Sequence, residues 1–314
     1  MRKIDVLLID TPNIDIIVDD EGRFPSPGQD FRVKDIGISM GGGAAISAMV
    51  LARLQMRPYM LCALGDDLFA GYIRSVLEKE GVGVEYKLSS ARTGISIALD
   101  IRNDRRFLTY GGSISGITPS DVPKELLSKA RHVHLTNYNG AEDYDEYVRF
   151  IETAGSCGVT VSIDMCWDDT GRWDGCTLKL AEKVDVFFSN DMEICHYLGE
   201  TDMNRVVELL SERGIRAVIK RGSRGASGIM DGQKLHVPAA PTRTVDTTGA
   251  GDAFNAGFLH AYLSGGNLRN CLQMGNICGA LSVAGYGGCP DTLNLSAIHA
   301  TAMADYVKMT NYCT

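Results

Sequence analysis

Short apolar runs rich in β-branched and aromatic residues alternate with helical patterns from about residue 59 onward. This alternation is typical of right-handed βαβ units, in which a helix connects two parallel strands. Strands are expected at 59–64, 132–137, 159–164, 184–189 and 216–221. Helices are expected at 68–80, 121–130, 142–156, 191–198 and 203–213. The pattern predicts an α/β fold with a mostly parallel central sheet, helices on both faces, and a ligand site beyond the carboxyl ends of the strands.

Two segments near the front of the chain break this alternation. Residues 13–39 contain Gly and Pro between β-like pieces, and residues 95–101 alternate apolar and polar side chains, as a half-buried strand does. Asn103-Asp104 suits a hairpin turn before a return strand. We therefore expect 13–39 and 93–113 to form a small separate sheet, which serves as a lid or a homodimer surface. The alternative is an edge sheet that has no functional role. No linker divides the chain, so residues 1–314 are expected to form a single domain.

The charge and hydropathy exclude several classes of function. A net charge of −8 and a pI near 5.3 argue against nucleic-acid partners and against a basic membrane contact. No apolar run approaches the roughly 20 residues that a membrane-spanning helix needs. The chain begins with two basic residues after Met1, but Asp5 and Asp10 interrupt the apolar stretch, so a buried first strand is favoured over a signal peptide.

The cysteines and histidines do not form a recognisable metal motif. The nine cysteines include no C-x-x-C pair, and the spacing of Cys157, Cys166 and Cys176 fits no zinc finger or ribbon. Free thiols in a reducing cytoplasm are expected, with a metal or redox site as the alternative. His132 and His134 share one face of an expected strand, where packing in the core or at the edge of a pocket is favoured over metal ligation.

A first glycine cluster, MGGGAAISAMVLARL at 40–54, opens a helix but matches no nucleotide-binding fingerprint. With Gly41 and Gly43 as the first pair, the third glycine of a dinucleotide-binding motif would fall on Ile46, and no acidic residue closes the following strand. The G-x-x-x-x-G-K-[ST] pattern of a P-loop is missing as well. The glycines are expected to let the backbone approach a ligand closely.

The second cluster, VDTTGAGDAFNAGF at 245–258, is more specific. Gly249, Ala250 and Gly251 carry almost no side chain, so their N–H groups can converge on one anion at the start of a helix expected from Asp252 to Leu263. Asp252 is either an ordinary first-turn acid or a working carboxylate. Asp246 and Thr248 bring oxygen atoms to the same turn, as a hard cation requires.

The sequence DTTGAGDAFNAGF closely resembles the signature of the ribokinase-like, or PfkB, carbohydrate kinases, and the resemblance extends along nearly the whole chain. It implies a three-layer α/β/α kinase fold with a small β lid. It also implies ATP as phosphoryl donor, Mg²⁺ as cofactor, and a bound monovalent cation such as potassium. The implied partners are a small sugar and ATP, with no nucleic acid or membrane, in the cytoplasm.

The resemblance also implies a set of site residues. Asp252 would be the catalytic base, and Gly249, Ala250 and Gly251 would form the anion hole. Substrate hydroxyls would meet the Asn13-x-Asp15 segment and the pair Gly41-Gly42. Mg²⁺ would be held, through water, by Asn190 and Glu193, and the monovalent cation by Asp246 and Thr248. The nucleotide-binding residues implied are Asn190, Lys220, Gly222, Gly225 and Asn276.

The chain departs from the family pattern at three places near the site. Ile46 stands where many members carry an Asn that contacts the sugar, and Lys220, followed by Arg221, replaces a usual Thr near the phosphates. Met165-Cys166-Trp167 stands where many relatives have Pro-Asn. These changes bear on the acceptor and leave the residues of phosphoryl transfer in place.

The expected reaction is therefore phosphorylation of a primary hydroxyl of a free monosaccharide. A phosphorylated sugar would need a basic cluster, and no Arg or Lys adjoins Asp15 or the 40–48 turn. A nucleoside acceptor, with Trp167 or Phe107 stacking on the base, is the main alternative. A catalytically silent sugar-binding protein on the same fold is the other, although Asp252 and Glu193 are both present.

Overall fold

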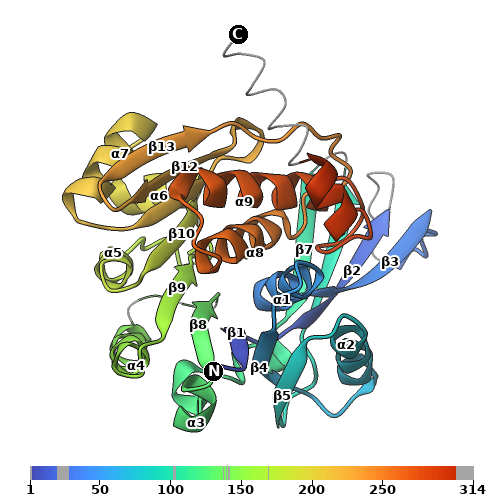
Figure 1. Cartoon of the computed structure of the whole chain (residues 1–314). Coiled ribbons are helices and arrows are strands. Elements are labelled where there is room, and N and C mark those ends of the chain that lie inside the picture. Colours follow the sequence, from blue (N-terminus) through green and yellow to red (C-terminus); the bar gives the residue numbers. More distant parts are fainter. Residues whose placement is uncertain are drawn as a thin grey trace.

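The computed structural model describes residues 2–19, 28–101, 104–136, 138, 140, 142–168 and 170–301. A nine-stranded sheet forms the centre of the molecule, in the order β13-β12-β11-β10-β9-β8-β1-β4-β5 (Figure 1). All neighbours are parallel except β11-β12 and β12-β13, so the expected mostly parallel sheet is confirmed. The strands are β1 (Ile4–Ile9), β4 (Pro58–Leu64), β5 (Gly83–Leu88), β8 (Ala130–Leu135), β9 (Thr160–Asp164), β10 (Val186–Asn190), β11 (Ala217–Lys220), β12 (Ala226–Met230) and β13 (Gln233–Val237).

Side chains along the buried strands point alternately to the two faces of the central sheet, and helices cover each face. In β1, Val6 and Leu8 point into one hydrophobic cluster, while Leu7 and Ile9 point into another on the opposite face. One face carries α3 (Lys124–Leu127), α4 (Tyr144–Ser156), α5 (Cys176–Ala181), α6 (Asp191–Leu198) and α7 (Met203–Glu212). The other carries α1 (Gly43–Arg53), α2 (Leu68–Lys79), α8 (Ala250–Leu263) and α9 (Leu268–Ser282). The result is a three-layer α/β/α architecture.

Most expected elements form, and one expected helix is largely replaced by turns. The segment 121–130 yields only the four-residue α3 after a 3₁₀ turn at Pro119–Asp121. Pro119 starts that turn and Pro123 precedes α3, and proline disfavours continuous helix in the residues before it. The short helix α5 was not expected, and α8 begins at Ala250, two residues before the expected start.

A second, four-stranded sheet has the order β3-β2-β6-β7 and extends from the side of the molecule near α1 (Figure 1). It consists of β2 (Asn13–Asp19), β3 (Asp35–Gly41), β6 (Ile95–Ile101) and β7 (Asp104–Tyr110). The two segments that break the sequence alternation thus pair with each other, Asp15 opposite both Ser39 and Ser96. Asn103 of the expected hairpin turn lies outside the described residues, as do the side chains of Arg105, Arg106 and Phe107.

In the part of the chain that the structure describes, none of the helices combines the length and the hydrophobicity of a membrane span.

His132 and His134 are fully buried between the sheet and α8, which confirms the packing interpretation. His132 is hydrogen-bonded to Thr160 and Ser162, and His134 to the same Ser162, each at 2.7 Å. The described cysteines are free thiols.

Candidate active site

Charged and polar side chains gather where the central strands end and α8 begins. Asp10 follows β1, Asp164 ends β9, Asn190 ends β10 and Lys220 ends β11. Because these strands are parallel, their carboxyl ends lie at one edge of the sheet. Asp252, in the first turn of α8, faces the same group from the helical layer.

Asp252 occupies a confined and electrostatically unusual position. A Cβ added to Gly43, the first residue of α1, would lie 2.7 Å from its Oδ1, so the bare glycine is what admits the carboxyl group. Ser47 fixes the turn by donating to the Asp252 main-chain oxygen at 3.0 Å. Burial and the neighbouring Asp164 raise the pKa of Asp252 to about 7, while Lys220 acts in the opposite direction. A carboxyl group poised near neutral pH is suited to general-base chemistry.

The Gly249–Gly251 turn is shaped by its lack of side chains. Gly249 has φ of 70°, and a Cβ there would meet the Gly288 Cα at 2.5 Å. Ile46 packs against the same two glycines, so this departure from the family pattern supports the loop. A Cβ on Gly251 would lie 3.3 Å from the Lys220 Nζ. The turn at the N-terminus of α8 therefore has an ammonium group beside it, an arrangement that favours a bound anion.

Two residues that the sequence analysis did not single out, Asp164 and Asn255, complete this group. The Asp164 Oδ2 accepts from the Lys220 Nζ and from the Asn255 Nδ2, each at 2.6 Å. The Asp164 Oδ1 and the Asn255 Oδ1 are buried, with no hydrogen-bond partner in the structure. The position of Asp164 at the end of the expected strand 159–164 was the only sequence signal for it.

Asn190 and Glu193, the expected magnesium residues, cap the start of α6. The Asn190 Oδ1 accepts from the Glu193 N–H at 2.8 Å, and the Glu193 Oε2 accepts from the Asn190 N–H at 2.9 Å. Burial raises the pKa of Glu193 to about 7. The second carboxylate oxygen of Glu193 and the unpartnered Asp164 Oδ1 are hard oxygen atoms, which suit a magnesium ion that keeps its waters.

The four expected substrate residues also come together. The Asn13 Nδ2 donates to the Asp15 Oδ1 at 2.7 Å, and Gly41 lies opposite Asn13 across β2 and β3. A Cβ on Gly41 would lie 2.5 Å from the Asp15 Oδ2. Gly42 has φ of 100°, and a Cβ there would lie 2.9 Å from the Pro12 Cα. Since Gly43 follows immediately and contacts Asp252, the Asp15 carboxylate and the Asp252 carboxylate flank the same glycine turn.

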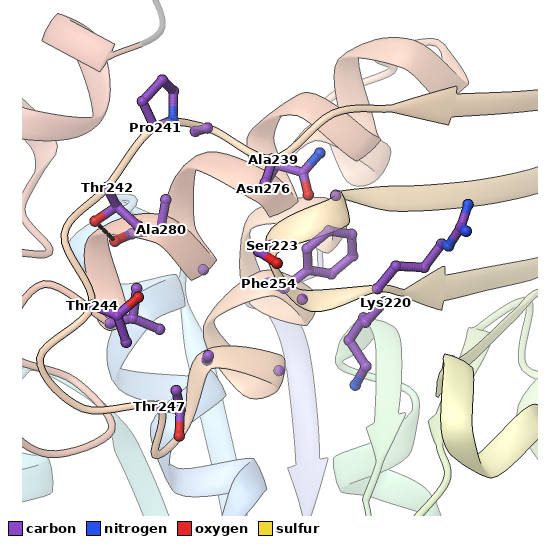
Figure 2. Close-up of a pocket in the computed structure, with 18 residues that line it drawn as sticks. Lys220, Ser223, Ala239, Pro241, Thr242, Thr244, Thr247, Phe254, Asn276 and Ala280 are labelled. Atoms are coloured by element: carbon purple, nitrogen blue, oxygen red, sulfur yellow. Dashed lines mark hydrogen bonds between the residues drawn. The ribbon is translucent and has the colours of Figure 1, made fainter.

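A cavity of about 480 Å³ lies on the other side of the α8 turn (Figure 2). Small and apolar side chains form much of its wall, with Thr242, Thr244 and Thr247 along one side and Lys220 on the other. Of the expected nucleotide residues, the ones that line it are Lys220, Gly222, Gly225 and Asn276, together with Ala250, Gly251 and Arg221. Asn190 is not among the described residues in this wall. The Asn276 Nδ2 donates to the main-chain oxygens of Val237 and Pro238, so it ties α9 to the cavity rim.

Asp246 and Thr248 form a tightly bonded turn. The Asp246 Oδ1 accepts from both the Thr248 N–H and its hydroxyl, at 2.9 and 2.8 Å, and the Asp246 Oδ2 accepts from the Gly287 N–H at 3.0 Å. Among the described residues, no group of three or more His, Cys, Asp or Glu side chains has a metal-binding arrangement. A cation at this turn would therefore rely mainly on main-chain and hydroxyl oxygens.

Trp167 does not line the 480 Å³ cavity and lies in an aromatic cluster. Its ring meets Trp173 edge-on at 4.8 Å and His196 at 5.4 Å, while about half of its surface stays exposed. These contacts give Trp167 a packing role in the loop after β9, beside any contact that it makes with an acceptor.

The pfkB family of carbohydrate kinases matches residues 3–294. The chain belongs to this family. A nucleoside kinase from Methanothermobacter thermautotrophicus is 29% identical over 86% of the chain and 87% of its own length. An ATP-dependent ribose-1-phosphate kinase from Halopiger xanaduensis is 31% identical over 84% of the chain and 87% of its own length.

Solved structures confirm the fold. An E. coli protein described as a ribokinase II, solved with ATP and Mg²⁺, superposes with a TM-score of 0.83 at 22% identity and covers 96% of this chain and 99% of its own. The chain thus has the ribokinase-like fold. The chain is a PfkB-family phosphotransferase that acts on an alcohol group of a sugar or nucleoside.

Proposed function

We propose that this kinase transfers the γ-phosphoryl group of ATP to a primary hydroxyl of a free monosaccharide. The observation that carries the proposal is the position of Asp252, between the group formed by Asn13, Asp15 and Gly41 and the cavity that Lys220 lines. The first of these presents carboxylate and amide groups suited to uncharged hydroxyls, and the second offers a positive charge and an apolar wall suited to a nucleotide.

In this proposal Asp252 removes the proton from the acceptor hydroxyl as its oxygen bonds to the γ-phosphorus. The bond from the γ-phosphorus to the β,γ-bridging oxygen breaks, and ADP leaves with that electron pair. The Gly249, Ala250 and Gly251 N–H groups would stabilise the charge on the transferred group, and Lys220 would add to their field. When bound, Mg²⁺ would shield the β- and γ-phosphate oxygens. Glu193 and Asn190, with Asp164 nearby, would orient its water shell.

Asp246 and Thr248 are proposed to support a monovalent cation, potassium, beside the anion hole. Their hydrogen bonds hold the turn together and tie it to the main chain of Gly287. Such an ion would fix the shape of the turn and extend its positive field without touching phosphate. A cytoplasmic site of action is also proposed, because ATP and free thiols are both expected there.

The second sheet is proposed to act as a lid and as a homodimer surface. Ile36, Ile38, Leu108 and Tyr110 lie on one face of it and are each between 51 and 58% exposed. A second copy of the chain would cover this apolar face. The opposite face carries Asp15, Ser39, Ser96 and Thr109, which would close over the acceptor and exclude water.

A nucleoside acceptor is the second candidate, favoured by the exposed ring of Trp167 at the end of β9 and by the relative named as a nucleoside kinase. ATP consumption should be measured over a panel of free pentoses and hexoses, nucleosides and sugar phosphates, with Asp252→Asn as the blank. We expect a free monosaccharide to give the highest kcat/KM. Preference for a nucleoside would establish the second candidate, and preference for ribose 1-phosphate or a fructose phosphate would show the free-sugar assignment to be wrong.

A further inference from the structure

The buried group formed by Asp164, Lys220 and Asn255 joins three elements next to the reaction site. Asp164 ends β9, Lys220 ends β11, and Asn255 lies one turn after Asp252 on α8. Both donors meet a single oxygen, the Asp164 Oδ2, at 2.6 Å. The strands are not neighbours, because β10 lies between β9 and β11. The three side chains therefore connect the ends of β9 and β11, which lie on either side of β10, to the start of α8.

The geometry constrains where the Lys220 ammonium can lie. Its side chain is largely buried, at 14% exposure, and so is that of Asp164, at 10%. The Nζ lies 3.3 Å from the Cβ position of Gly251, in the turn that forms the anion hole. A lysine stem is flexible, and without a fixed partner the ammonium could move toward solvent in the 480 Å³ cavity. The bond to Asp164 holds it at the turn.

A purely structural role explains this arrangement poorly. A buried ion pair gains little stability over well-packed apolar side chains, because both ions lose their hydration. Apolar side chains form clusters on both faces of the sheet directly behind this point, so packing alone could fill the position. The lysine also stands beside a turn with three adjacent small residues, where an anion can approach.

We propose that Asp164 and Asn255 are positioning residues that hold the Lys220 ammonium beside the Gly249–Gly251 turn, where it contacts the γ-phosphoryl group during transfer. This inference rests on the proposed kinase function and adds a specific role for three residues to it. In the loose transition state the charge of the transferred group is spread over its three equatorial oxygens, where an ammonium group can bind it. The contact should therefore affect kcat and γ-phosphate recognition and leave acceptor binding unchanged.

The test is a double-mutant cycle on the full-length protein with Lys220→Met, Asp164→Asn and the combined variant. Lys220→Met keeps the length of the stem and removes the charge. We expect kcat to fall by about 10- to 100-fold, the acceptor KM to stay within about twofold, and the preference for MgATP over MgADP in equilibrium binding to fall by about tenfold. Asp164→Asn should reproduce these changes in part, because the ammonium is no longer held by an opposite charge.

The combined variant decides how Asp164 acts and guards against poor folding of the single variants. It removes both buried charges, so it should fold at least as well as Lys220→Met. If Asp164 works through Lys220, the double variant should be no slower than Lys220→Met alone. Multiplication of the two single effects would overturn the inference, as would an Asp164→Asn protein with the kcat and ATP-over-ADP preference of the wild type.

Asp5→Asn is the matched control. It breaks an ion pair of similar length, Asp5 with Arg57 at 2.9 Å, at the opposite end of the strands. It should lower thermal stability without changing kcat or the ATP-over-ADP preference. A wild-type protein that binds no ATP and consumes none with any acceptor would instead refute the proposed function. If the wild type is active and Lys220→Met has the same kcat and the same ATP-over-ADP preference as the wild type, only this inference is refuted.

Discussion

Gly41 lies directly against Asp15: a Cβ at position 41 would be 2.5 Å from the Oδ2 of the carboxylate and 2.6 Å from its Oδ1. The contact joins β3 to β2 at the point where Asn13 donates to the same carboxylate. The proposed sugar-binding group, Asn13, Asp15 and Gly41, thus requires that position 41 carry no side chain.

Gly41→Ala should therefore weaken acceptor binding. The methyl group must displace the Asp15 carboxylate, so we expect the acceptor KM to rise by about 10- to 100-fold with ATP binding unchanged. Gly71→Ala is the control, because Gly71 lies inside α2 with nothing within 4 Å of its Cβ position. It should stabilise the protein by about 0.5–1 kcal/mol and leave kinetics alone. An unchanged acceptor KM in Gly41→Ala would remove Asp15 from the acceptor site.

Asp252→Asn should reduce turnover by about 10²- to 10⁴-fold, because the amide keeps the shape of the carboxyl group but cannot take a proton. ATP affinity, measured by calorimetry, should change little, since the anion-hole N–H groups remain. Turnover close to that of the wild type would show that Asp252 is only a first-turn acid of α8.

The pH dependence of kcat should report the ionisation of Asp252. Its pKa is raised to about 7, and only the deprotonated form can act as base, so kcat should rise with pH and level off above about pH 8. Lys220→Met should move this limb to higher pH, because the lysine charge lowers the pKa of Asp252. Asp10, Asp164 and Lys220 are the charged groups that act on it, and a limb that stays in place in Lys220→Met would argue against this assignment.

Potassium should support higher activity than sodium at matched ionic strength. The larger ion gives up its water more readily to main-chain and hydroxyl oxygens of the Asp246–Thr248 turn. Initial rates in the two chloride salts, with tetramethylammonium as the reference, measure the effect. Equal rates in all three would leave Asp246 as a turn residue that binds Thr248 and Gly287.

Stability should fall with acid below about pH 6.5, because burial lowers the pKa of His132 and of His134 to about 3. Between these values the unfolded chain binds protons that the folded chain excludes, so each histidine lowers the free energy of unfolding by about 1.4 kcal/mol per pH unit. Thermal unfolding between pH 7.5 and 4.5 measures the slope. His134→Gln should flatten it, and an equal slope in the variant and the wild type would contradict the burial argument.

Most of the strands and helices, and the residues of the signature turn, could be predicted from local patterns in the sequence. The alternation from residue 59 gave the parallel strands, because period-two and period-3.6 patterns are local properties. Asp252 and its glycine turn could be recognised in the signature at 245–258, because residues that are adjacent in the sequence form an anion-binding turn. The helix expected at 121–130 was mostly wrong, because Pro123 interrupts it. The proline is itself a local signal, but the helical pattern of the surrounding residues was given more weight.

Contacts between side chains that are far apart in the sequence depend on the folded arrangement of the strands and helices. Asp164 and Asn255 are 91 positions apart, and Lys220 reaches Asp164 over 56 positions, so no local pattern could indicate their shared oxygen. The same holds for Gly43 against Asp252 and for Ile46 against Gly288. Parallel strands bring their carboxyl ends to one edge whatever their distance in sequence, and the order of the strands then sets which charges become neighbours.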